Sequence, residues 1–130
     1  MRTGGHFHRQ RMLDLAQGCL AGAAQTDFDA FTDALGKYMT HAGEMFREVQ
    51  SGLYRTEEIA SAVAAAQSSG LAAVGQSSWG PTVFGFASNE AEAAEAARVL
   101  SNSSIVSGRH VVVTEACNHG ALYRSLTLVS

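Results

Sequence analysis

The chain has 130 residues, of which 46% are hydrophobic and 16% are charged, and its formal net charge is −3. This length fits one domain with its own core, so we expect a single domain over residues 1–130, with 1–8 as a flexible start. The scattered basic residues and the acidic net charge argue against a nucleic-acid partner. Without a long apolar run or a secretory signal, we expect a cytoplasmic protein with no membrane partner.

Three helices are expected in the first half of the chain. Apolar residues recur at helical spacing over 9–24, and the pattern restarts at Thr26, which is a plausible N-cap, and continues to Gly52. The apolar stripe from 28 to 49 is interpreted as core. A third helix should run from Thr56 to Gly70, with acidic residues in its first turn.

After Gly70 the period becomes that of short strands. Asn89 and Glu92 resemble a capping box that opens one further helix. The expected elements are strand 71–74, strand 82–87, helix 90–100, strand 110–116 and strand 121–129. The order α-α-α-β-β-α-β-β predicts an α+β two-layer sandwich, in which helices cover a small, mainly antiparallel, ferredoxin-like sheet.

The sequence GQSSWGPT interrupts the first predicted strand pair with glycines, small hydroxyls and the chain's one tryptophan. Glycine permits close approach of backbone, and backbone N–H groups with serine hydroxyls can hold an anion such as phosphate. The other interpretation is an ordinary turn whose tryptophan covers the core; we expect that side chain at the rim of a cleft. The candidate substrate-binding residues are Gly75, Gln76, Ser77, Ser78, Trp79, Gly80 and Thr82.

Other chemistry-bearing residues give weaker signals. His6 with His8, on an extended segment, and Cys117 with His119 have ligand-like spacing, but neither pair has third and fourth ligands at zinc-like spacing. We therefore expect no metal site, and Cys19 is assigned to the core. The secondary site candidates, taken from a polar turn and from a charge on an otherwise apolar strand face, are Asn118, His119 and Arg124.

The run SSGLAAVGQSSWGPTVFGF resembles the third conserved motif of the GHMP kinase superfamily, which lies in the C-terminal domain of those enzymes. Within this motif, the segment GQSSWGPT resembles the form found in β-ribofuranosylaminobenzene 5′-phosphate synthases, which are enzymes of tetrahydromethanopterin biosynthesis. DFDAFTDAL at 27–35, QSGLY at 50–54 and NHGA at 118–121 are also similar to that family's C-terminal half. The loop departs from ordinary GHMP kinases, because it retains only Gly75 and Gly80 where they have several consecutive glycines.

The resemblance implies a transferase domain that helps to condense phosphoribosyl diphosphate with 4-aminobenzoate or a hydroxybenzoate. Nothing in the chain resembles the superfamily's N-terminal nucleotide loop, and the net charge suits a polyphosphate poorly. We therefore expect the chain to be inactive alone, to need an N-terminal GHMP domain or a second chain, and to bind no cofactor by itself, with Mg²⁺ confined to a complete enzyme. No catalytic residue is assigned. A homo-oligomer is the default, since a missing domain exposes apolar surface. The alternative function is a stand-alone ferredoxin-like module that binds a small ligand without catalysis.

Overall fold

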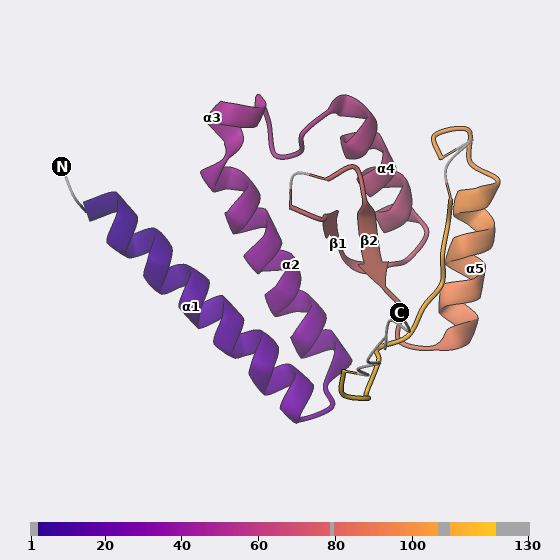
Figure 1. The fold of residues 1–130 in the computed structure, drawn as a ribbon, viewed down its shortest axis with the longest axis horizontal. Helices are drawn as coiled ribbons and strands as arrows, with labels where there is room; N and C mark the ends of the chain where they lie inside the picture. Colours follow the sequence, from indigo (N-terminus) through magenta and orange to yellow (C-terminus); the bar gives the residue numbers. More distant parts are fainter. Residues whose placement is uncertain (1–2, 79, 107–109, 122–130) are drawn as a thin grey trace, which may run out of the picture.

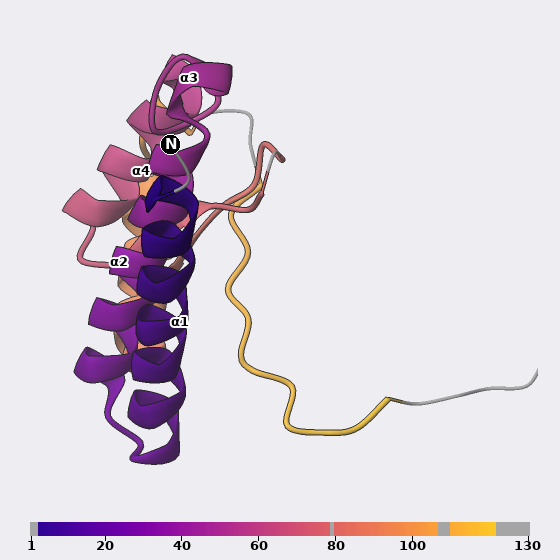
Figure 2. The same cartoon turned by 90° about the vertical axis from the view of Figure 1, so that its left-hand side faces the viewer.

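A computed structural model describes residues 3–78, 80–106 and 110–121 of the chain. The helices form one layer, and the two strands lie on one side of it (Figures 1 and 2). The α+β class is therefore confirmed. In chain order the elements are α1 (Thr3–Ala24), α2 (Phe28–Met45), α3 (Arg47–Gln50), α4 (Glu57–Ser68), β1 (Ala72–Gln76), β2 (Val83–Phe86) and α5 (Glu90–Ser101).

Helices α1 and α2 form an antiparallel hairpin (Figure 1). Helix α1 begins at Thr3, six residues before the predicted start at 9, so residues 3–8 belong to the helix. The predicted N-cap of α2 was also wrong by one residue. Thr26 has a φ of 55°, which turns the chain, and Asp27 takes the extended conformation that a cap requires and accepts a hydrogen bond from the Ala30 N–H at 2.9 Å.

The long helix predicted over 26–52 is broken at Phe46. The Phe46 N–H donates to the Gly43 carbonyl at 3.1 Å, which tightens the last turn of α2 before the short α3. Ser51 then takes a left-handed conformation, and the chain folds back so that Leu53 lies over Gly43. A Cβ atom at Gly43 would lie 2.8 Å from Leu53 Cδ1, so this return depends on the glycine.

The predicted start of the helix at Thr56 and the predicted cap at Asn89 are both confirmed. At the start of α4, Thr56 accepts a hydrogen bond from the Ile59 N–H at 3.2 Å. At the start of α5, Asn89 accepts one from the Glu92 N–H at 2.9 Å. The Glu92 carboxylate reaches back to the hydroxyl and the N–H of Ser88, so both helices begin where the sequence places them.

Strands β1 and β2 pair antiparallel, with Gln76 opposite Val83 and Ala72 opposite Phe86. The register shifts at a bulge where Ala73 has a φ of 44°. Between the sheet and α4 and α5 lies the buried core, to which Tyr54, Leu71, Val83, Val106 and Val111 add partly buried side chains. Its members are Ile59, Val63, Ala66, Val74 and Leu100.

The strand predicted over 110–116 is absent: these residues form no β-ladder with any described residue. Val111 packs against the core, but Val112 is 78% exposed and Val113 is 52% exposed. Figure 2 shows the segment on the side of the molecule away from the helix layer. A run of β-branched residues needs a hydrogen-bonding partner to become a strand. The partner predicted for it is the segment 121–129, of which only Ala121 is among the described residues.

Among the described residues, no helix is both long and apolar enough to cross a lipid bilayer.

Candidate functional site

The loop between β1 and β2 closes as a tight turn through its own backbone. The Ser77 N–H donates to the Thr82 carbonyl at 2.9 Å, and the Gly80 N–H donates to the Ser77 carbonyl at 2.9 Å. Ser78 has a φ of 49°. Because two of the loop N–H groups are engaged inside the turn, an anion bound here would depend on the serine hydroxyls and on the remaining amides.

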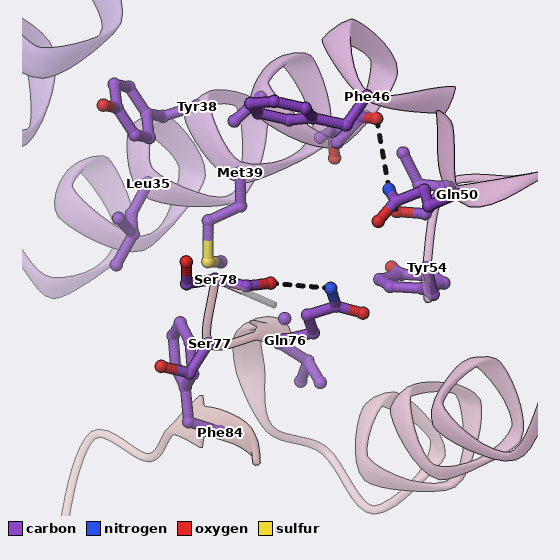
Figure 3. A pocket seen from close by; sticks show the side chains of 16 residues that line it. Leu35, Tyr38, Met39, Phe46, Gln50, Tyr54, Gln76, Ser77, Ser78 and Phe84 are labelled. Carbon is purple, nitrogen blue, oxygen red and sulfur yellow. Dashed lines mark hydrogen bonds between the residues drawn. The ribbon is translucent and has the colours of Figure 1, made fainter. Parts of the chain in front are cut away.

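Gln76 ties this loop to the segment that follows α3. Its Oε1 accepts a hydrogen bond from the Arg55 N–H at 2.9 Å, and its Nε2 donates to the Ser78 carbonyl at 2.7 Å (Figure 3). The two bonds use the two ends of one amide group. The side chain therefore acts as a bridge between two parts of the chain that lie 21 residues apart.

Gly75 serves close packing at this point. A Cβ atom on Gly75 would lie 2.7 Å from the sulfur of Met39 and 3.2 Å from its Cε. The missing side chain thus lets α2 approach β1, and it does not serve a left-handed backbone, since Gly75 is not among the residues of positive φ.

A pocket of about 450 Å³ opens between α2, the 50–54 segment and the loop. Its walls are mainly apolar and aromatic, and a few polar groups converge at one side (Figure 3). Small-molecule sites commonly have this size and this composition. The lining residues are Leu35, Tyr38, Met39, Thr40, Ala42, Gly43, Phe46, Gln50, Leu53, Tyr54, Val74, Gly75, Gln76, Ser77, Ser78 and Phe84.

The polar groups of the pocket are neutral. None of the described residues that line it carries a charged side chain. Burial raises the pKa of the Tyr54 phenol above its usual value, so this group stays protonated at neutral pH and can donate a hydrogen bond. Gln50 is held by its Nε2, which donates to the Leu53 carbonyl at 2.9 Å. The pocket is suited to a flat apolar body with polar substituents.

The structure brings four of the seven predicted loop residues to this pocket: Gly75, Gln76, Ser77 and Ser78. Gly80 and Thr82 contribute to the turn and not to the lining. Trp79 lies outside the described residues, so its predicted place at the rim stays a prediction.

The secondary candidates lie elsewhere. Asn118 and His119 are exposed in the segment that follows the missing strand, and they do not line the pocket. Arg124 lies outside the described residues.

The aromatic residues that line the pocket were not identified from the sequence. The apolar stripe over 28–49 was interpreted as core, yet Tyr38, Met39 and Phe46 line the pocket, and Phe46 is 45% exposed. Tyr54 comes from the QSGLY segment, whose resemblance to a known family was the one available signal. A helix stripe alone cannot tell which of its residues face a cavity.

The two pairs with ligand-like spacing, at which no metal site was expected, are His6 with His8 and Cys117 with His119. Residues 6 and 8 both lie within α1, so the extended segment on which that pair depended is replaced by helix. The Cys117 thiol donates a hydrogen bond to the His119 carbonyl oxygen at 3.8 Å, so its partner is the backbone of His119 and not the imidazole ring. Among the described residues no cluster of three or more His, Cys, Asp or Glu side chains could hold a metal ion.

The described residues form an α+β domain in which a pocket without charged lining residues lies beside a glycine-bounded loop. Residues 20–105, more than half of the chain, match the family described as GHMP kinases C terminal. The chain therefore belongs to the GHMP kinase C-terminal domain family, as the loop motif predicted. Searches of curated proteins and of solved structures gave no significant match.

Proposed function

We propose that this chain supplies the C-terminal, arene-binding side of an active site like that of the β-ribofuranosylaminobenzene 5′-phosphate synthases. Membership of the GHMP family implies an N-terminal partner domain and a kinase-like subunit. The observation that carries the finer proposal is the position of the aromatic pocket directly beside the QSSWGP loop. A flat ring would lie against Tyr38, Tyr54 or Phe84, and Ser77 and Ser78 would meet its polar substituents.

The proposed reaction joins C1 of the ribose to the ring carbon that carries the carboxylate. The bond from C1 to diphosphate breaks and the ring loses carbon dioxide, so phosphoribosyl diphosphate and 4-aminobenzoate give a carbon-linked ribosyl arene, diphosphate and carbon dioxide. The departing diphosphate requires positive charge. No lysine or arginine lines the described pocket, so that charge comes from the partner domain or a second chain.

The described pocket does not suit Mg²⁺. Magnesium prefers carboxylate oxygens and water in an octahedral arrangement, and no Asp or Glu lines the described pocket. Any magnesium that accompanies the diphosphate would have its ligands elsewhere in the complete enzyme, and we derive no step through it.

A second function is favoured by the same uncharged lining. A neutral aromatic pocket can bind a small molecule that carries no phosphate. A binding module without catalysis would need only this property. The two functions differ in whether bound ligand is converted.

The test measures labelled carbon dioxide released from carboxyl-labelled 4-aminobenzoate in the presence of phosphoribosyl diphosphate and Mg²⁺. We expect release when the chain is combined with an N-terminal GHMP domain and none from the chain alone. A Tyr54→Leu variant, which keeps an apolar wall, should bind 4-aminobenzoate more weakly, whereas Ser68→Ala on the exposed side of α4 should match the parent. Binding of 4-aminobenzoate without any release in the combined system would favour the binding module.

A further inference from the structure

A pair of histidines joins α1 to α2, and neither of them is among the described residues that line the pocket, although Thr40 and Ala42 on either side of His41 do line it. His8 Nδ1 lies 3.2 Å from His41 Nε2, and the ring centroids are 5.0 Å apart with the planes tilted by 32°. Both side chains are half-buried, so solvent reaches them. Since 33 residues separate the two histidines in sequence, only the helical hairpin brings them together.

The distance between the two nitrogens matches that of ligands on one metal ion. A tetrahedral zinc ion with Zn–N bonds of about 2.0–2.1 Å holds two imidazole nitrogens about 3.3 Å apart. A direct N–H···N hydrogen bond also fits 3.2 Å, at the long end of the usual range of hydrogen-bond distances. The described hydrogen bonds give neither ring another protein partner. Both rings are therefore available to turn their lone pairs toward a common ion.

The two histidines lie on helices that pack against each other along the hairpin. Close contact at Gly18 and Gly22 holds α1 against α2: a Cβ atom at Gly18 would lie 3.1 Å from the Ala34 Cβ. The Phe7 ring also lies edge-on to His8, with centroids 6.0 Å apart. Two ligands on helices that already pack together lose less freedom when a metal binds than two ligands on separate segments, which favours binding.

We infer that His8 and His41 form a two-histidine site for a divalent cation of the zinc class, which fastens α1 to α2. Imidazole nitrogen suits Zn²⁺, Cu²⁺ and Ni²⁺, whereas Mg²⁺ and Ca²⁺ prefer oxygen. No third His, Cys, Asp or Glu completes a cluster among the described residues. With two protein ligands among the described residues, the proposed site takes water at its remaining coordination positions and binds with moderate affinity.

The experiment titrates the protein with ZnCl₂ and follows the imidazole resonances by NMR, with calorimetry for the stoichiometry. We expect one ion per chain, with shifts at His8 and His41 and none at His110 or His119. The bound state should carry its ring protons on His8 Nε2 and His41 Nδ1, because the facing nitrogens hold the metal. Cu²⁺ added in place of zinc should give an electron paramagnetic resonance signal with two equatorial nitrogens.

The matched variants are His8→Gln and His41→Gln, with His110→Gln, at an exposed position, as control. Each of the first two should weaken zinc binding by at least about tenfold, since even the loss of a supporting group costs about 10–100-fold, while the control should match the parent. Circular dichroism checks that each variant is folded. The inference is overturned if no zinc binds at millimolar concentration, if His41→Gln binds as the parent does, or if only His6→Gln abolishes binding.

Discussion

Gly75 of β1 lies so close to Met39 of α2 that a Cβ atom would come within 2.7 Å of the methionine sulfur. The contact lies in the lining of the pocket, and it links the packing of the helix on the sheet to the volume of the site. A methyl group at this point would push the flexible Met39 side chain toward the space that a ligand would use.

Gly75→Ala should therefore cost about 1 kcal/mol in unfolding free energy, at the low end for overpacking because Met39 can change rotamer, and it should weaken ligand binding. The matched control is Gly36→Ala in α2, where a Cβ atom would have 3.8 Å to its nearest neighbour. That change should stabilise the helix by about 0.5–1 kcal/mol. Chemical denaturation followed by circular dichroism measures both; equal effects of the two substitutions would contradict this account of Gly75.

Two substitutions at Gln76 should affect the Arg55 N–H differently, because only one of them removes its hydrogen-bond acceptor. In Gln76→Ala both bonds of the bridge are lost, so the Arg55 N–H should exchange its hydrogen much faster. Gln76→Glu keeps an oxygen for Arg55 but places a carboxylate against the Ser78 carbonyl, so protection should persist at Arg55 while the loop loosens.

Native-state hydrogen exchange measures this difference directly. Gln67→Ala, at an exposed position of α4, is the control, and it should leave hydrogen exchange unchanged both at the Arg55 N–H and in the loop after β1. If Arg55 is equally protected in the parent and in Gln76→Ala, then Gln76 is not the bridge that holds the loop.

The α1–α2 hairpin depends on Gly22. A Cβ atom there would lie 2.6 Å from the Phe31 backbone nitrogen and 2.8 Å from its Cα. Backbone cannot move aside as a side chain can, so Gly22→Ala should cost about 1–3 kcal/mol or separate the two helices. Gly5→Ala in the same helix, with nothing within 4 Å, should be neutral or stabilising. Thermal unfolding of the two variants beside the parent tests the contrast, and a neutral Gly22→Ala would rule out close contact at this crossing.

Glu92 predicts a pH dependence at the start of α5. Hydrogen bonds that the Ser88 hydroxyl and then the Ser88 N–H donate to its carboxylate lower the pKa of Glu92 below its ordinary value. A lowered pKa in the folded state means that the ionised carboxylate stabilises the fold above its unfolded pKa, and that this stability is lost as the pH falls through the folded value. Glu92→Gln should therefore be less stable than the parent at neutral pH, and the difference should disappear under acid conditions.

NMR titration of the Glu92 side chain in the parent and in Ser88→Ala measures the cause. Removing the hydroxyl should move the Glu92 pKa back toward its ordinary value. An unchanged titration would show that the Ser88 hydroxyl is not what lowers the pKa.

The sequence by itself determined the features that depend on neighbours along the chain. Local propensity and hydrogen bonding explain the start of α4 after Thr56, the cap at Asn89, the change of period at Gly70 and the pairing of β1 with β2, and each is present. The sequence of the GQSSWGPT loop also indicated the family that residues 20–105 match.

Only the tertiary structure decided the features that depend on contacts between distant residues. The fold-back of Leu53 over Gly43 broke the long helix and made one wall of the pocket. Val112 and Val113 have the composition of a strand but no described partner to pair with. His8 and His41 meet because α1 and α2 pack as an antiparallel hairpin, and no spacing along the chain encodes such a meeting.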